Sequence, residues 1–109
     1  MSKHKFFPSA LCLLILFPVA ARADDYVLSL KDHQFTPAEL VLPANQKIKL
    51  IIKNLDATPA EFESSDLNRE KVVDANGAIT IFLEPLDPGV YGYFDDFHRD
   101  TSKGTIKVK

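Results

Sequence analysis

From residue 26 onward the chain is divided into seven short apolar or alternating runs, and turn residues separate each run from the next. The runs cover 26–30, 39–42, 46–53, 61–63, 78–83, 89–94 and 104–108. In the run 46–53, two lysines alternate with Ile48 and Leu50, which is the period of a half-buried strand. Proline, asparagine and glycine lie in the intervening segments, such as 43–45 and 87–89. Short strands at this spacing predict an all-β fold, a Greek-key sandwich or barrel.

One segment leaves the secondary structure open. Residues 64–73 read SSDLNREKVV and carry a weak helix-start signal at Ser65. The alternative is an irregular loop that leads into a strand at Lys71–Val73, and we favour this second interpretation.

Residues 1–23 have the three-part layout of a secretory signal peptide. Lys3 and Lys5 precede an almost wholly apolar stretch over 6–20, and Ala21-Arg22-Ala23 matches the small-x-small cleavage pattern. The apolar stretch is shorter than the roughly 20 residues that a membrane-spanning helix needs. We therefore expect cleavage after Ala23 and a periplasmic domain over 24–109 without a membrane span; an uncleaved anchor is the alternative.

Removal of the signal changes the composition of the working protein. Residues 24–109 keep all 15 acidic residues but only 10 of the 13 basic ones, so their net charge is −5. The only cysteine and the only methionine lie in the signal, and two histidines remain. An acidic surface argues against nucleic acid and suits a protein that attracts cations. A cysteine nucleophile is excluded, and neither a G-x-S-x-G elbow nor a glycine-rich phosphate loop is present.

Oxygen and nitrogen donors cluster in two places. Asp95, Asp96 and His98 follow the run 89–94 directly, and Glu61 and Glu63 lie two apart on a predicted strand, so they point to one face. Carboxylates with imidazole and no sulfur suit a hard or borderline cation such as Fe(III), Fe(II) or Mn(II). The alternative is a solvated acidic rim. The second histidine, His33, is expected to be an exposed loop residue.

Two stretches resemble a known family. PGVYGYFDDFHRDTSKGTIKV at 88–108 and FTPAELVLPANQKIKLIIKNLD at 35–56 are similar to the last and first strands of cupredoxins. The resemblance implies a Greek-key β-sandwich with a metal site at one end. On the matching positions, the family's copper-binding cysteine falls on Asp95 and its C-terminal histidine on His98. Because blue copper needs the thiolate, the composition excludes a type 1 electron-transfer site.

The two other copper ligands of the family are also replaced. The N-terminal histidine falls on Ala60 or Glu61, and the axial methionine falls on Ser102 or Lys103. The resemblance thus leaves one of four ligands intact and adds carboxylates around it.

The phrases AEFESSDLNREKVV and PLDPGVYGYFDDFH resemble the cupredoxin-like domains of the EfeO and FtrB type, which accompany ferrous-iron permeases. This implies iron binding in the periplasm, with Glu61, Asp95 and His98 as ligands and Glu63 and Asp96 as second choices. The implied partners are an inner-membrane iron permease and other periplasmic iron-uptake proteins. A ferroxidase-type step would need a separate electron acceptor. A copper(II) carrier and a metal-free interaction module of a transport complex remain as alternatives.

Overall fold

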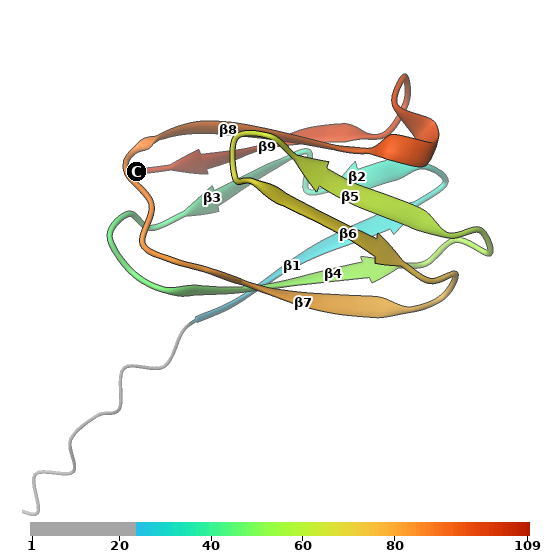
Figure 1. Ribbon diagram of the computed structural model, residues 1–109, viewed down its shortest axis with the longest axis horizontal. Helices are drawn as coiled ribbons and strands as arrows, with labels where there is room; N and C mark the ends of the chain where they lie inside the picture. Colours follow the sequence, from blue (N-terminus) through green and yellow to red (C-terminus); the bar gives the residue numbers. More distant parts are fainter. Residues whose placement is uncertain (1–23) are drawn as a thin grey trace, which may run out of the picture.

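The computed structural model describes residues 24–109 (Figure 1). The predicted signal peptide, 1–23, lies outside the described residues, so its cleavage stays a prediction. Within 24–109, no helix is both long and apolar enough to cross a membrane.

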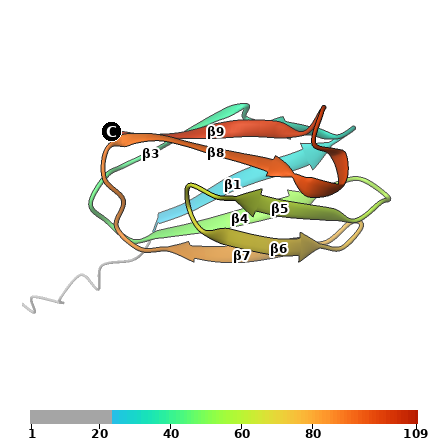
Figure 2. The same ribbon diagram turned by 45° about the horizontal axis from the view of Figure 1, so that its top comes forward.

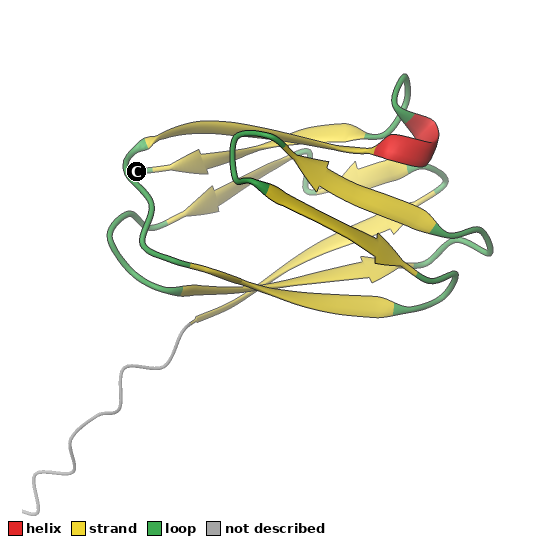
Figure 3. Cartoon of the chain, viewed as in Figure 1, coloured by secondary structure: helices red, strands yellow, loops and turns green. Residues whose placement is uncertain are grey.

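The described residues form nine strands and one short 3₁₀ helix, arranged as two facing sheets (Figures 1 and 3). The elements are β1 (Asp24–Lys31), β2 (Gln34–Thr36), β3 (Glu39–Leu42), β4 (Ile48–Asn54), β5 (Ala60–Ser64), β6 (Arg69–Val73), β7 (Ala78–Leu83), β8 (Gly89–Asp95), η1 (Asp96–His98) and β9 (Lys103–Val108). The predicted all-β class is confirmed.

Each sheet mixes parallel and antiparallel neighbours. The first sheet has the order β2-β1-β4-β7, in which β1 runs parallel to β4 with Tyr26 opposite Leu50. The second has the order β3-β9-β8-β5-β6, in which β3 runs parallel to β9, and β8 is antiparallel to both β9 and β5. The chain passes from β4 to the β5–β6 hairpin of the other sheet and returns at β7 (Figure 2). This is the predicted two-sheet sandwich.

The core lies between the sheets because alternate residues of each strand face inward. In β4, Ile48, Leu50 and Ile52 are fully buried, whereas Lys49 and Lys53 face outward. Inward side chains from the second sheet, such as Phe62 and Ile106, complete one continuous hydrophobic cluster. The alternation read from the sequence in 46–53 is therefore confirmed.

Two strands, β2 and β6, lie outside the seven apolar or alternating runs of the sequence. In β6, only Val73 is buried, so this edge strand has no apolar alternation to reveal it. The strand at 71–73 is confirmed and begins two residues earlier, and the helical alternative for 64–73 is wrong. The three-residue β2 contributes only Phe35 to the core, so the sequence shows no hydrophobic periodicity there that would predict a strand.

Several connections meet at one end of the sandwich, on the right in Figure 1. They are the turn between β1 and β2, the loop after β4, and η1 with the segment 99–102 that follows it. Side-chain hydrogen bonds join them: Asp56 accepts from the first turn, and Ser102 donates to it.

Candidate metal centre

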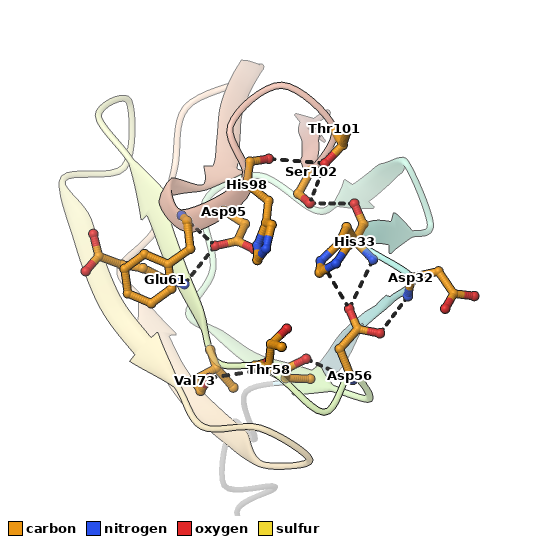
Figure 4. Close-up of polar contacts among 12 residues, drawn as sticks. Asp32, His33, Asp56, Thr58, Glu61, Val73, Asp95, His98, Thr101 and Ser102 are labelled. Atoms are coloured by element: carbon orange, nitrogen blue, oxygen red, sulfur yellow. Dashed lines mark hydrogen bonds and ion pairs between the residues drawn. The ribbon is translucent and has the colours of Figure 1, made fainter.

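Asp95 is the last residue of β8, and its side chain is fully buried. It faces inward like Tyr93, two residues earlier. A buried carboxylate is costly unless it is hydrogen-bonded. Oδ1 accepts the backbone N–H of Glu61 at 2.9 Å and that of Phe97 at 3.0 Å, and Oδ2 lies 2.8 Å from Nδ1 of His98 (Figure 4). The fold therefore fixes this carboxylate in one orientation.

Two histidine rings lie beside this carboxylate. His98 ends η1, and its ring stacks on that of His33 from the β1–β2 turn, with centroids 3.9 Å apart and planes 27° apart (Figure 4). One potential ligand atom from each of His33, Asp95 and His98 lies within 4.8 Å of the other two. Three segments that are distant in the sequence thus bring two imidazoles and a carboxylate to one point.

The closest pair of these donor atoms is joined by a hydrogen bond. Oδ2 of Asp95 and Nδ1 of His98 lie 2.8 Å apart, which is an ordinary hydrogen-bond distance. An ion that takes both of these atoms as ligands would therefore have to displace the proton between them.

His33 lies on a turn, as expected, and its side chain is 40% exposed. Its ring is nevertheless part of the cluster, which the sequence does not suggest. Contact between residues 33 and 98 depends on the β1–β2 turn lying against η1, and no periodicity encodes that arrangement. The one available signal is that residues 24–109 contain only two histidines.

The glutamates predicted as ligands lie elsewhere. Glu61 and Glu63 face outward from β5, on either side of the buried Phe62, and they gather with Glu70, which pairs with Glu63 across the β5–β6 ladder. Only the backbone N–H of Glu61 contacts Asp95. The predicted ligand set is therefore divided between two clusters.

The surroundings of Glu61, Glu63 and Glu70, which we call the outer cluster, disfavour a negative charge on Glu61. Partial desolvation, followed by the nearby carboxylates of Glu70 and Asp96, raises the pKa of Glu61 above its ordinary value. Asp96 itself pairs with Arg99 and is partly exposed, whereas Asp95 is fully buried. Asp95 and Asp96 therefore have separate surroundings, as neighbouring residues at a strand end do.

The comparison with known families decides what kind of domain this is. A family model described as a cupredoxin-like domain matches residues 5–108. The chain belongs to the cupredoxin-like domain family. An uncharacterised protein of Rickettsia prowazekii (strain Madrid E) is 51% identical over 81 residues, which are 74% of this chain and 65% of that protein. The chain thus spans slightly less than two thirds of this relative's length.

Solved structures share the fold at low sequence identity. Amicyanin from Paracoccus versutus matches with a TM-score of 0.63 and 17% identity, covering 81% of this chain and 84% of that one. Auracyanin A, a blue copper protein from Chloroflexus aurantiacus, gives 0.68 and 13%, covering 81% and 100%. The metal-binding domain of the Cu(I)-exporting ATPase CopA of Streptococcus pneumoniae gives 0.69 and 11%, covering 78% and 84%.

This cupredoxin-like domain does not fit a thiolate-bound copper. Residues 24–109 contain neither cysteine nor methionine, and β8 ends in a buried aspartate. The buried hydroxyl of Ser102 donates to the carbonyl of His33. Ala60 is buried, and its side chain has no atom that could bind a metal ion. What fits the donors present is a hard or borderline ion on imidazole and carboxylate.

Proposed function

We propose that this protein binds a divalent first-row transition-metal ion between His33, Asp95 and His98, and that iron is its metal. The observation that carries the proposal is the convergence of these three donors to within 4.8 Å. Two histidines and one carboxylate with open positions are the donor set typical of non-haem Fe(II). The excess of acidic residues adds a long-range attraction for cations.

The burial of the three donors suits reversible loading. Asp95 is fully buried and held by two backbone N–H groups, so it provides a fixed carboxylate. The side chains of His33 and His98 are 40% and 31% exposed, so an ion can reach them from solvent. A site with one fixed ligand and two accessible ones suits a carrier that takes up and releases its ion.

We further propose that the protein works in the periplasm and delivers iron to an inner-membrane permease. The signal-like residues 1–23 support export, and the resemblance to domains that accompany ferrous-iron permeases supports the partner. Detection of the processed protein in the periplasmic fraction, and its capture with a permease after cross-linking, would test the two parts separately.

Copper(II) is the second candidate metal. Sites of nitrogen and oxygen donors bind Cu(II) more tightly than Fe(II). Auracyanin A, which shares the fold, is a blue copper protein. Without sulfur ligands, any copper here would be bound as Cu(II) on histidine and carboxylate.

Anaerobic calorimetry with Fe(II), and parallel titrations with Mn(II) and Cu(II), test the proposal. We expect one Fe(II) per chain in the wild type and at least a tenfold loss of affinity in each of His33→Ala, Asp95→Asn and His98→Ala. Glu61→Ala and Glu63→Ala serve as matched controls from the outer cluster, and near-UV circular dichroism confirms folding. Absence of binding tighter than micromolar would overturn metal binding and favour an interaction module. Tight binding of Cu(II) alone would favour the copper carrier.

A further inference from the structure

The main chain of His33 is held on both sides by side chains from distant segments. Its N–H donates to Oδ2 of Asp56 at 3.0 Å, and its carbonyl accepts from the hydroxyl of Ser102. Asp56 also accepts the N–H of Asp32 at 2.6 Å through Oδ1 (Figure 4). Asp32 and His33 have φ angles of 51° and 59°, in the left-handed region that residues other than glycine rarely adopt. Such a conformation persists where surrounding contacts enforce it, and this often occurs at functional sites.

The same carboxylate also faces the imidazole ring. Oδ2 of Asp56 lies 3.7 Å from Nδ1 of His33, which is an ion-pair distance longer than a hydrogen bond. The Asp56 side chain is only 12% exposed, so water screens this interaction weakly. A negative charge on the Nδ1 side favours a proton on Nδ1 and leaves the lone pair of Nε2 for a metal ion.

Asp56 is itself fixed by its neighbours. Its backbone N–H donates to Oδ1 of Asn54 at 3.0 Å. Asn54 is buried, and its amide donates to the carbonyls of Thr58, Val73 and Asp74. A continuous chain of hydrogen bonds therefore runs from the end of β4 to the turn that carries His33.

We propose that Asp56 is a positioning residue of the metal centre: it holds His33 against His98 and directs Nε2 of His33 to the ion. This inference rests on the proposed function, in which His33 is a ligand. It adds to that function the residue that selects the ligating nitrogen. Carboxylates that orient metal-binding histidines in this way commonly change metal affinity by 10- to 100-fold.

If Asp56 only stabilised the turn, its charge would not affect which ring nitrogen of His33 carries the proton. If Asp56 positions His33, removal of the charge should move that proton. Asp56→Asn keeps the size of the side chain and one hydrogen-bond acceptor but removes the charge that faces Nδ1. Asp66→Asn is a matched control, because Asp66 also accepts a backbone N–H, that of Gly92 at 2.8 Å, outside the metal centre.

The test combines ¹⁵N NMR of the histidine rings in the metal-free protein, at a pH where they are neutral, with Fe(II) titration. We expect a proton on Nδ1 of His33 in the wild type and in Asp66→Asn, and a shift toward Nε2–H in Asp56→Asn. We also expect Fe(II) affinity to fall about tenfold or more in Asp56→Asn and to stay within twofold in Asp66→Asn.

Each result has one interpretation. An Nε2–H ring of His33 in the wild type overturns the inference, even if Asp56→Asn fails to fold. Unchanged Fe(II) affinity in a folded Asp56→Asn also overturns it. A wild type that binds no metal overturns the proposed function, whereas the ring protonation still reports whether Asp56 orients His33.

Discussion

At the scale of single residues, Tyr93 combines a well-packed ring with an unpartnered hydroxyl. The ring packs between Phe35 and Phe62, with centroids 4.9 and 5.4 Å away, and among the described residues the buried hydroxyl has no hydrogen-bond partner. Burial raises the pKa of Tyr93 to about 12. Because a buried unpaired polar group costs about 1–3 kcal/mol, we expect Tyr93→Phe to raise the free energy of unfolding by about 1 kcal/mol. Urea denaturation measures this, and a destabilised variant would reveal a missing partner.

Gly104 makes room for that tyrosine. A Cβ at this position would collide with the hydroxyl oxygen of Tyr93. We expect Gly104→Ala to lower the free energy of unfolding by about 1–3 kcal/mol through overpacking. Gly92→Ala is the matched control on β8, because its Cβ would meet only a carboxylate oxygen of Asp66 at 3.6 Å. Equal effects of the two substitutions in urea denaturation would contradict the steric explanation.

Glu61 makes stability depend on pH. Its pKa in the folded protein is raised above the ordinary 4.5 by desolvation and by Glu70 and Asp96. A raised pKa means that the folded state binds the proton more tightly, so this contribution to stability is present below about pH 4.5 and is lost as the pH rises through the folded value. We expect Glu61→Gln to raise the melting temperature at pH 7 and to leave it unchanged at pH 3.5.

Ionic strength and a glutamate outside the cluster provide the controls for the effect of Glu61→Gln on the melting temperature. The gain at pH 7 should shrink at high ionic strength, because the repulsion is between carboxylates that are at least partly in contact with solvent. Glu39→Gln, on β3 and outside the cluster, should change the melting temperature little. A gain that is equal at both pH values would exclude carboxylate repulsion as its cause.

At the scale of elements, Asn54 connects the end of β4 to two loops. Its buried amide donates to the carbonyls of Thr58, Val73 and Asp74. Asn54→Ala would leave these acceptors without their donor and shift the turn that contains Asp56. We expect a loss of about 2–3 kcal/mol in the free energy of unfolding, together with weaker Fe(II) binding. A loss of stability without any change in Fe(II) affinity would show that the loop acts independently of the metal centre.

The elements differ in how far the sequence reveals them. The alternation in β4 follows from its burial. The apolar runs of β7 and β8 can also be read from the chain, although Phe82 and Val90 within them are exposed. An edge strand such as β6 buries one residue and carries no such pattern. The sequence also places Asp95 and His98 together, because three residues separate them at a strand end. It cannot place His33 beside them, since that contact arises only when the β1–β2 turn packs against η1.

At the scale of the whole molecule, a cupredoxin-like sandwich brings carboxylate and imidazole side chains together at one end without any sulfur ligand. A buried aspartate occupies the end of β8, and two stacked histidines lie next to it. The glutamates form a separate outer cluster on the opposite face of β5. The sequence predicts one site of carboxylates and imidazole, whereas the structure separates these residues into two clusters. Residue types alone do not show which face of a strand meets the loop end.

Crystals grown with Fe(II) under anaerobic conditions test the central claim most directly. An anomalous difference map recorded at the iron edge locates the ion without any assumption about its ligands. We expect one strong peak within about 2.0–2.3 Å of donor atoms from His33, Asp95 and His98. A peak at Glu61, Glu63 and Glu70 instead, or no peak near Asp95 in crystals that contain iron, would contradict the claim that the inner cluster is the metal centre.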